Sequence, residues 1–163
     1  MTLLAFVLTL VTAGAGQHVH PQPPAAGDAA ATSALSAEAV QQLLAGDGMG
    51  LARPAEVHGY PGPKHLLERA SELALSAEQQ KRLAAIRQEV LDTARPLGKA
   101  IVQAERDLDA AFKSGGLTEG DVKTRLEAIA ALQAELRLVH LRAHLLAKPL
   151  LTAVQLEQYY QPR

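Results

Sequence analysis

The chain has 163 residues, of which 48% are hydrophobic and only 3% aromatic, and its formal net charge is −1. Ala and Leu supply most of the apolar fraction, which is typical of long helices because these side chains lose little conformational freedom there. The near-neutral charge provides no overall field that favours nucleic acid. The absence of cysteine excludes disulfides, thiolate metal sites and cysteine nucleophiles.

Residues 1–15 have the pattern of a signal peptide. Residues 3–11 form an apolar run that is too short to span a bilayer, and Ala13-Gly14-Ala15 follows as a small-residue cleavage site. No Lys or Arg precedes the run, so either the true start lies upstream or the α-amino group supplies the positive charge. An uncleaved anchor or a buried segment is the alternative. We expect cleavage and export to the periplasm, with residues 16–34, rich in Gly, Ala, Pro and Gln, as a disordered tether.

Residues 35–62 are expected to hold one short helix and a loop. Leu35 to Ala45 has helical periodicity, with Ser36 as its N-cap. The stretch that follows, up to Gly62, is rich in glycine and proline and predicts a loop. Pro63 suits the first turn of a further helix that runs to about Leu73.

Two long amphipathic helices are predicted between residues 76 and 148. In both, apolar side chains recur at steps of three and four and form one stripe. Pro96 lies inside the first stripe, which keeps its phase, so we expect a kink and not a break. The two lengths of roughly 38 and 30 residues correspond to about 57 and 45 Å. Because Ser114-Gly115-Gly116 ends the first helix and Thr118 caps the second, the pair is predicted to form an antiparallel hairpin.

A sequence motif occurs once before this hairpin and once after it. Leu75-Ser76-Ala77-Glu78-Gln79 and Leu151-Thr152-Ala153-Val154-Gln155 both have capping-box spacing, in which a hydroxyl and a Gln side chain satisfy backbone N–H groups at a helix start. A short last helix is expected to follow Thr152 and to end near Tyr160. A helix start explains each copy fully; the two copies together, flanking a hairpin in a chain with a signal sequence, resemble the LTxxQ motif of the Spy/CpxP family.

The resemblance covers roughly residues 63–160, with Ser76 where the motif has Thr. This family consists of periplasmic envelope-stress proteins, including chaperones, stress regulators and zinc-resistance or nickel/cobalt-sensing proteins. The resemblance implies an all-α, cradle-shaped dimer that binds unfolded or aggregation-prone clients without ATP. The alternatives are a heavy-metal-binding sensor or resistance protein and a helical partner of a membrane sensor kinase.

A second apolar strip runs along the end of the second long helix. Leu138, Leu141 and Leu145 lie nearly opposite the main stripe of that helix. Such a strip is typical of a dimer seam or a client-binding surface, unless the N-terminal helices of the same chain cover it. We predict a homodimer and a client surface that combines these leucines with four basic residues: Arg137, His140, His144 and Lys148.

His140 and His144 are spaced to share one helix face and could chelate a divalent ion such as Zn, Ni, Co or Cu. Two cations on the same stripe disfavour a third, and a carboxylate would have to come from Glu89 or Glu105 across the hairpin. Three interpretations stay open: a plain basic or helix-flanking role for the pair, a metal site, and a client surface that gains charge at mildly acid pH.

No catalytic constellation is apparent. Ser76, Thr118 and Thr152 are explained as helix caps, and the chain has no Gly-x-x-x-x-Gly-Lys-[Ser/Thr] loop for nucleotide binding. The basic residues are dispersed and aromatic residues are scarce, which argues against single-stranded nucleic acid as a partner. We therefore expect a binding protein that is not an enzyme and requires no cofactor.

Overall fold

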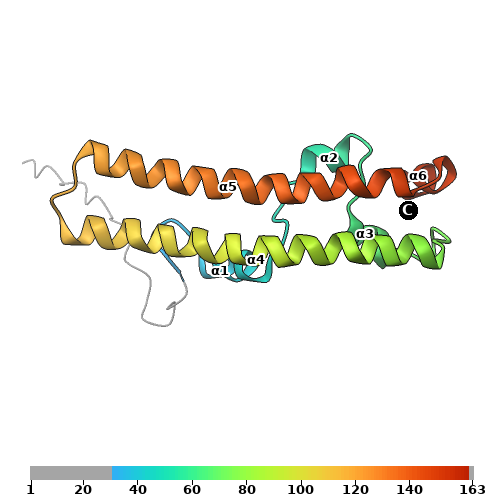
Figure 1. Ribbon diagram of the computed structural model, residues 1–163, viewed down its shortest axis with the longest axis horizontal. Coiled ribbons are helices and arrows are strands. Elements are labelled where there is room, and N and C mark those ends of the chain that lie inside the picture. The colour runs from blue at the N-terminus through green and yellow to red at the C-terminus, as the bar shows by residue number, and fades with distance from the viewer. Residues whose placement is uncertain (1–30, 162–163) are drawn as a thin grey trace, which may run out of the picture.

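The computed structural model describes residues 31–161, and in this part of the chain the fold is all-helical without a strand. Helices α4 (Ala77–Ser114) and α5 (Glu119–Ala147) have 38 and 29 residues. They pack side by side as an antiparallel hairpin (Figure 1), which confirms the predicted fold class. α4 continues unbroken through Pro96. The predicted signal peptide and most of the predicted tether lie outside the described residues.

Short helical segments flank the hairpin: α1 (Ala37–Ala45), α2 (Arg53–Val57), α3 (Pro63–Glu68), the 3-10 turn η1 (Lys148–Leu150) and α6 (Ala153–Tyr160). Two of them correct the sequence predictions. α2 lies in the segment that was expected to be loop, and α3 ends at Glu68 rather than near Leu73. α2 has no side-chain cap, and only the proline in its first turn marks it as a helix.

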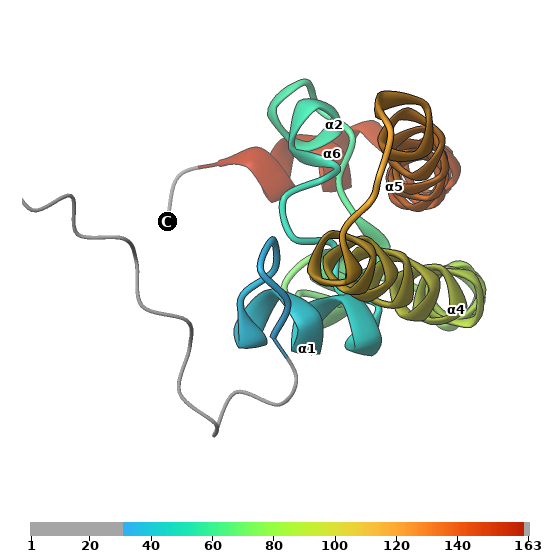
Figure 2. The same cartoon turned by 90° about the vertical axis from the view of Figure 1, so that its left-hand side faces the viewer.

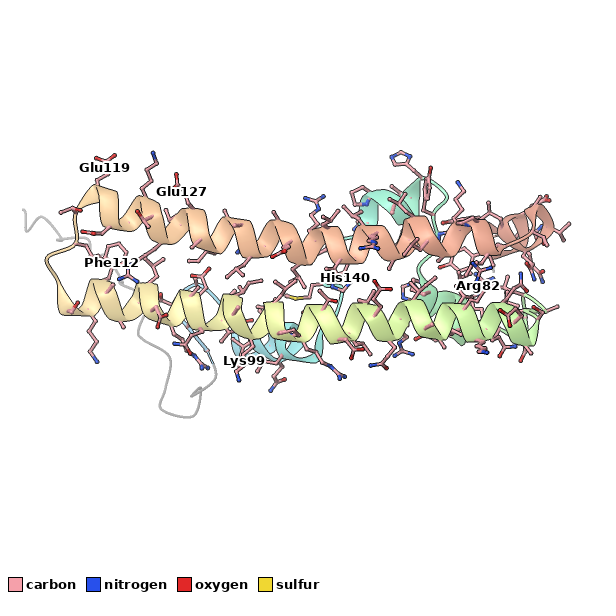
Figure 3. All side chains as sticks on the ribbon, in the orientation of Figure 1. Arg82, Lys99, Phe112, Glu119, Glu127 and His140 are labelled. Carbon is pink, nitrogen blue, oxygen red and sulfur yellow. The ribbon has the colours of Figure 1, made fainter. Side chains whose placement is uncertain are left out.

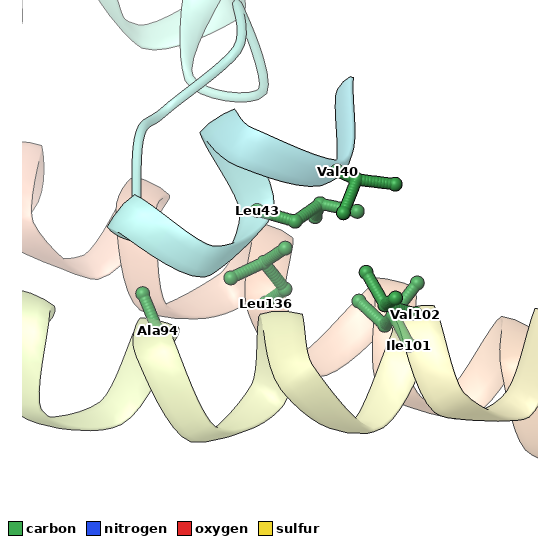
Figure 4. Packing of buried hydrophobic residues seen from close by; sticks show 6 residues of the cluster. All are labelled: Val40, Leu43, Ala94, Ile101, Val102 and Leu136. Atoms are coloured by element: carbon green, nitrogen blue, oxygen red, sulfur yellow. The ribbon is translucent and has the colours of Figure 1, made fainter. Parts of the chain in front are cut away.

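α1 packs directly against the backbone of α4. A Cβ atom on Gly98 would lie 2.1 Å from the carbonyl oxygen of Leu43, so only glycine permits this approach. The contact belongs to a buried cluster that joins α1 to both long helices (Figure 4), made of Val40, Leu43, Ala94, Ile101, Val102 and Leu136. The N-terminal segment of the described structure, residues 31–68, is therefore part of the same core as the hairpin.

A second buried cluster ties the end of the hairpin to α3 and α6. It consists of Leu66, Leu73, Leu75, Leu83 and Ala147. Beside it, the Arg69 guanidinium donates from Nη1 to the carbonyl oxygen of Tyr159 at 2.6 Å and lies 4.8 Å from the centroid of the Tyr159 ring. These contacts fix α6 against α3.

The short helices gather on one side of the hairpin. Viewed along the hairpin, α1, α2 and α6 all lie to one side of α4 and α5 (Figure 2). The opposite side carries no further helix from the described residues. Within residues 31–161, no helix combines the length and the apolar character needed to cross a membrane.

Candidate functional site

Both sequence motifs form the capping boxes that their spacing predicts. At the start of α4, the Ser76 hydroxyl accepts from the Gln79 backbone N–H and the Gln79 side chain accepts from the Ser76 N–H, at 3.2 and 2.8 Å. Thr152 and Gln155 repeat the arrangement at the start of α6, at 3.2 and 3.0 Å. Leu75 is buried and Leu151 half-buried, and both pack in the second cluster.

The two motifs also meet in space. The Gln79 side-chain amide donates to Gln155 Oε1 at 2.8 Å and to the Leu150 carbonyl at 2.7 Å. The Gln155 amide donates in turn to Gln79 Oε1 at 3.2 Å and to the Leu73 carbonyl at 3.2 Å. We call this reciprocal pair the glutamine clasp. It holds the start of α4 to the start of α6, so each glutamine does more than cap its own helix.

The predicted client surface divides into two parts, and the first part is exposed. Leu138 is 61% exposed and Leu145 58%, while Leu141 is half-buried; we call these three leucines the outer ridge. The short N-terminal helices do not bury them. Arg137 is exposed, whereas the Lys148 ammonium lies 3.8 Å from the centroid of the Tyr60 ring in a cation–π contact.

The second part consists of His140 and His144, which do not belong to that exposed surface. They are only 8% and 7% exposed. Successive residues of a helix are about 100° apart, so both rings lie at one edge of the predicted client surface. This edge is the one nearest the buried face of α5. The N-terminal segment covers this edge, so the prediction that both histidines face clients is corrected.

His144 is held by a backbone hydrogen bond. Its Nδ1 lies 2.7 Å from the carbonyl oxygen of Tyr60. Because a carbonyl oxygen can only accept, Nδ1 carries the proton and donates it. A Cβ atom on Gly62 would lie 2.8 Å from His144 Cε1, so the glycine allows the loop before α3 to pass closely over the ring.

His140 has no such partner. Its Nε2 is buried and forms no hydrogen bond within the described structure. Burial lowers the pKa of His140 and the neighbouring His144 lowers it further, whereas Asp47 acts in the opposite direction. The ring is therefore favoured in its neutral form.

A cavity of about 410 Å³ lies beside the two histidines. One wall is the hairpin itself, and the other is formed by residues of the loop 46–50, α2 and the start of α3. Figure 3 shows His140 on the side of α5 that faces α4. The hairpin wall is formed by Arg87, Val90, Leu91, His140, Ala143 and His144.

Neither of the two carboxylates that were expected to join the histidine pair lines the cavity. Glu89 lines a separate small groove on the other side of the hairpin and does not line the cavity. Glu105 is buried, but it lies 14 positions beyond Leu91, or about 21 Å along α4. Among residues 31–161, no cluster of three or more His, Cys, Asp or Glu side chains is placed to hold a metal ion.

Sequence reasoning did not find the cavity. In the last part of α5, the buried positions are His140, Ala143, His144 and Ala147, whereas the bulky leucines point outward. Alanines fill little volume against the N-terminal segment, which leaves space beside the imidazole rings. The sequence did contain a signal for it. These four residues are separated by three, one and three positions, a helical spacing that marks a second inward-facing stripe.

Comparisons with models of protein families, with curated proteins and with solved structures gave no match.

Proposed function

We propose that this protein is an ATP-independent chaperone of the bacterial periplasm that holds apolar segments of unfolded clients on the outer ridge of α5. The observation that carries the proposal is the exposure of Leu138 and Leu145, both of which are more than half exposed among the described residues. Arg137 and Arg142 are also exposed beside them. Such charges keep an apolar ridge soluble and speed encounter with clients.

The magnitude of the interaction suits a holding function. Complete burial of two leucine side chains contributes about 3–6 kcal/mol, and binding of roughly 4 kcal/mol corresponds to a millimolar dissociation constant. One ridge would therefore bind and release clients quickly. Two ridges in one assembly would raise the apparent affinity through effective concentration.

We accordingly propose a homodimer. A shallow groove on α4 and α5, lined by these two helices alone, contains Ile86, Val90, Val139 and the 40% exposed Leu146. No other described helix lies on the side of the hairpin opposite α1, α2 and α6. A second copy packed there would bury this groove and leave both outer ridges accessible.

The test is suppression of aggregation of a chemically denatured protein at equimolar ratio. The double variant Leu138→Asp/Leu145→Asp is expected to lose suppression, because it places two charges on the ridge. The matched control is Phe112→Asp/Leu126→Asp, at positions 59% and 50% exposed near the hairpin turn, which is expected to retain suppression. Equal behaviour of the two double variants, or no suppression by the wild type, would remove the proposal.

The alternative function is heavy-metal binding, with a sensor kinase as a further candidate partner. His140 Nε2 is buried without a partner, which leaves one ring nitrogen for a metal. His144 uses Nδ1 for Tyr60, so a metal at the pair would need both Nε2 atoms and further ligands. Calorimetric titration of wild type and His140→Ala with zinc separates this alternative: binding that the substitution abolishes supports it, and unchanged binding does not.

A further inference from the structure

The cavity beside His140 has the size of a small-molecule site. Its volume of about 410 Å³ lies within the range of about 300–1,000 Å³ that is common for ligand pockets. It lies on the side of α5 that residues 46–65 cover, whereas Leu138 and Leu145 of the outer ridge are more than half exposed and do not line it. A ligand in the cavity and a client on the ridge would therefore not compete for the same surface.

Cations outnumber carboxylates around this cavity. Arg53, Lys64 and Arg87 line it from three different helices. Within the described structure, none of these three side chains forms an ion pair or a hydrogen bond. The carboxylates in the lining are Asp47 and Glu56, and Glu56 Oε1 lies 3.7 Å from His65 Nδ1. All three cations are solvent-exposed, and positive charge without partners favours an anionic ligand.

The remaining wall is apolar. Val90, Leu91 and Ala143 contribute to the hairpin side, and Met49 and Ala52 contribute to the side of the N-terminal segment. A simple inorganic anion would not use this surface. A ligand with both an anionic group and an apolar body would match both kinds of wall, since apolar burial and charge pairing then act together.

His140 provides a hydrogen-bond donor inside the cavity. The ring is neutral when buried, so only one nitrogen carries a proton. Because a buried N–H without an acceptor is rarer than an unsatisfied acceptor, the unpartnered Nε2 favours the tautomer with the proton on Nδ1. Nδ1 lies near the loop 46–50, at 3.6 Å from where a Cβ atom of Gly48 would be.

From these observations we propose that the cavity is a binding site for a small amphipathic carboxylate, with Arg87, Arg53 and Lys64 attracting the anionic group and Val90, Leu91 and Met49 contacting the apolar body. His140 then donates from Nδ1 to a ligand oxygen. The site goes beyond the proposed chaperone function and does not depend on it.

Calorimetry with octanoate tests the proposal, with 1-octanol as a neutral probe of equal chain length and acetate as an anion without the chain. Octanoate is expected to bind more tightly than either probe. Arg87→Gln is expected to weaken octanoate binding about tenfold, the usual effect of losing a charge-assisted hydrogen bond. Arg82→Gln removes the same charge from an exposed position of α4 outside the cavity (Figure 3) and should change binding less than about twofold.

NMR of the histidine rings locates the ligand. Octanoate is expected to shift the His140 signals and to leave those of His58 unchanged, since His58 is exposed and does not line the cavity. The ridge variant Leu138→Asp/Leu145→Asp should still bind octanoate, which separates this site from the client surface. Equal binding of octanoate and octanol, an unshifted His140, or equal effects of Arg87→Gln and Arg82→Gln would each overturn the proposal.

Discussion

Gln79 and Gln155 hydrogen-bond to each other through both side-chain amides, although 76 positions separate them in the chain. Each glutamine also closes the capping box of its own helix. The motif copies that resemble the LTxxQ pattern thus form a single structural unit. This explains why glutamine suits the last position of both copies: a carboxylate could cap the helix but would lack the amide hydrogens that reach Leu73 and Leu150.

Gln79→Ala and Gln155→Ala are each expected to lower the free energy of unfolding by about 1–3 kcal/mol, because each leaves part-buried groups without partners. The double variant is expected to lose less than the sum, by about 0.5–3 kcal/mol, since the two side chains share hydrogen bonds. Urea denaturation measures all three. Gln88→Ala, at an exposed position of α4 where the side chain bonds only to Asp92, is the control and should change stability little. Strict additivity of the two alanine substitutions would contradict the clasp.

Gly98→Ala and Gly120→Ala are expected to change the stability of the fold in opposite directions. At Gly98 the added methyl group would overlap the Leu43 carbonyl, so α1 must move and stability should fall by more than about 1 kcal/mol. At Gly120 the nearest atom is Thr118 Oγ1 at 3.7 Å, so alanine should raise stability by about 0.5–1 kcal/mol through its helix propensity. Thermal unfolding followed by circular dichroism compares the pair; a stabilised Gly98→Ala variant would refute the close packing of α1.

His144→Ala is expected to destabilise the fold by about 1–3 kcal/mol, since the Tyr60 carbonyl loses its donor. His144→Asn offers an amide donor of shorter reach and should recover part of the loss. Urea denaturation measures both variants, and His58→Ala at an exposed position is the control. Equal loss for alanine and asparagine would indicate that ring packing matters more than the hydrogen bond.

Acidification is expected to lower stability through His140. Burial lowers the pKa of this ring below its ordinary value of 6.5, so the unfolded chain takes up the proton more readily than the folded one. The stability that the neutral His140 ring contributes is fully present above pH 6.5 and is lost as the pH falls below that value. Between about pH 6.5 and 5, where carboxylates stay ionised, the unfolding free energy should decline less steeply for His140→Gln than for wild type. Parallel pH profiles of the two proteins would disprove this assignment.

The homodimer that we propose predicts a solution mass twice that of one chain at micromolar concentration. Leu146→Asp, together with Val139→Asp, should shift the mass to that of a monomer, because both residues line the groove on the uncovered side of the hairpin. Light scattering after size-exclusion chromatography measures the mass. The ridge variant Leu138→Asp/Leu145→Asp is the control and should stay dimeric; dissociation of that variant would place the interface on the outer ridge instead.

Local sequence signals predicted the long helices well. Stripes of apolar residues and the caps Ser76 and Thr118 gave the starts of α4 and α5, since these signals depend only on neighbours in the chain. α2 escaped prediction because its N-cap, Ala52, makes no side-chain bond. In that case the tertiary fold, and not the local sequence, sets the helix.

The candidate site was harder to predict because it depends on where distant segments meet. Exposure of Leu138 and burial of His140 follow from the side of α5 on which the N-terminal segment lies, and helical periodicity does not specify that side. Gly98 is the clearest example of a residue whose role depends on the tertiary structure. In the sequence it is only a glycine two positions after Pro96, whereas the structure shows that α1 can pack against α4 because residue 98 has no side chain.

The far end of the hairpin differs from the rest in one respect: between Glu105 and Ile129, no residue is buried in the described structure. Little apolar packing stabilises the helices there. Their amide hydrogens should therefore exchange with solvent faster than those near the glutamine clasp. Protection from hydrogen exchange should therefore increase along the hairpin, from a turn that opens readily to the end that the glutamine clasp holds closed. Fraying would begin at Gly115 and Gly116 and would stop where α1 crosses α4.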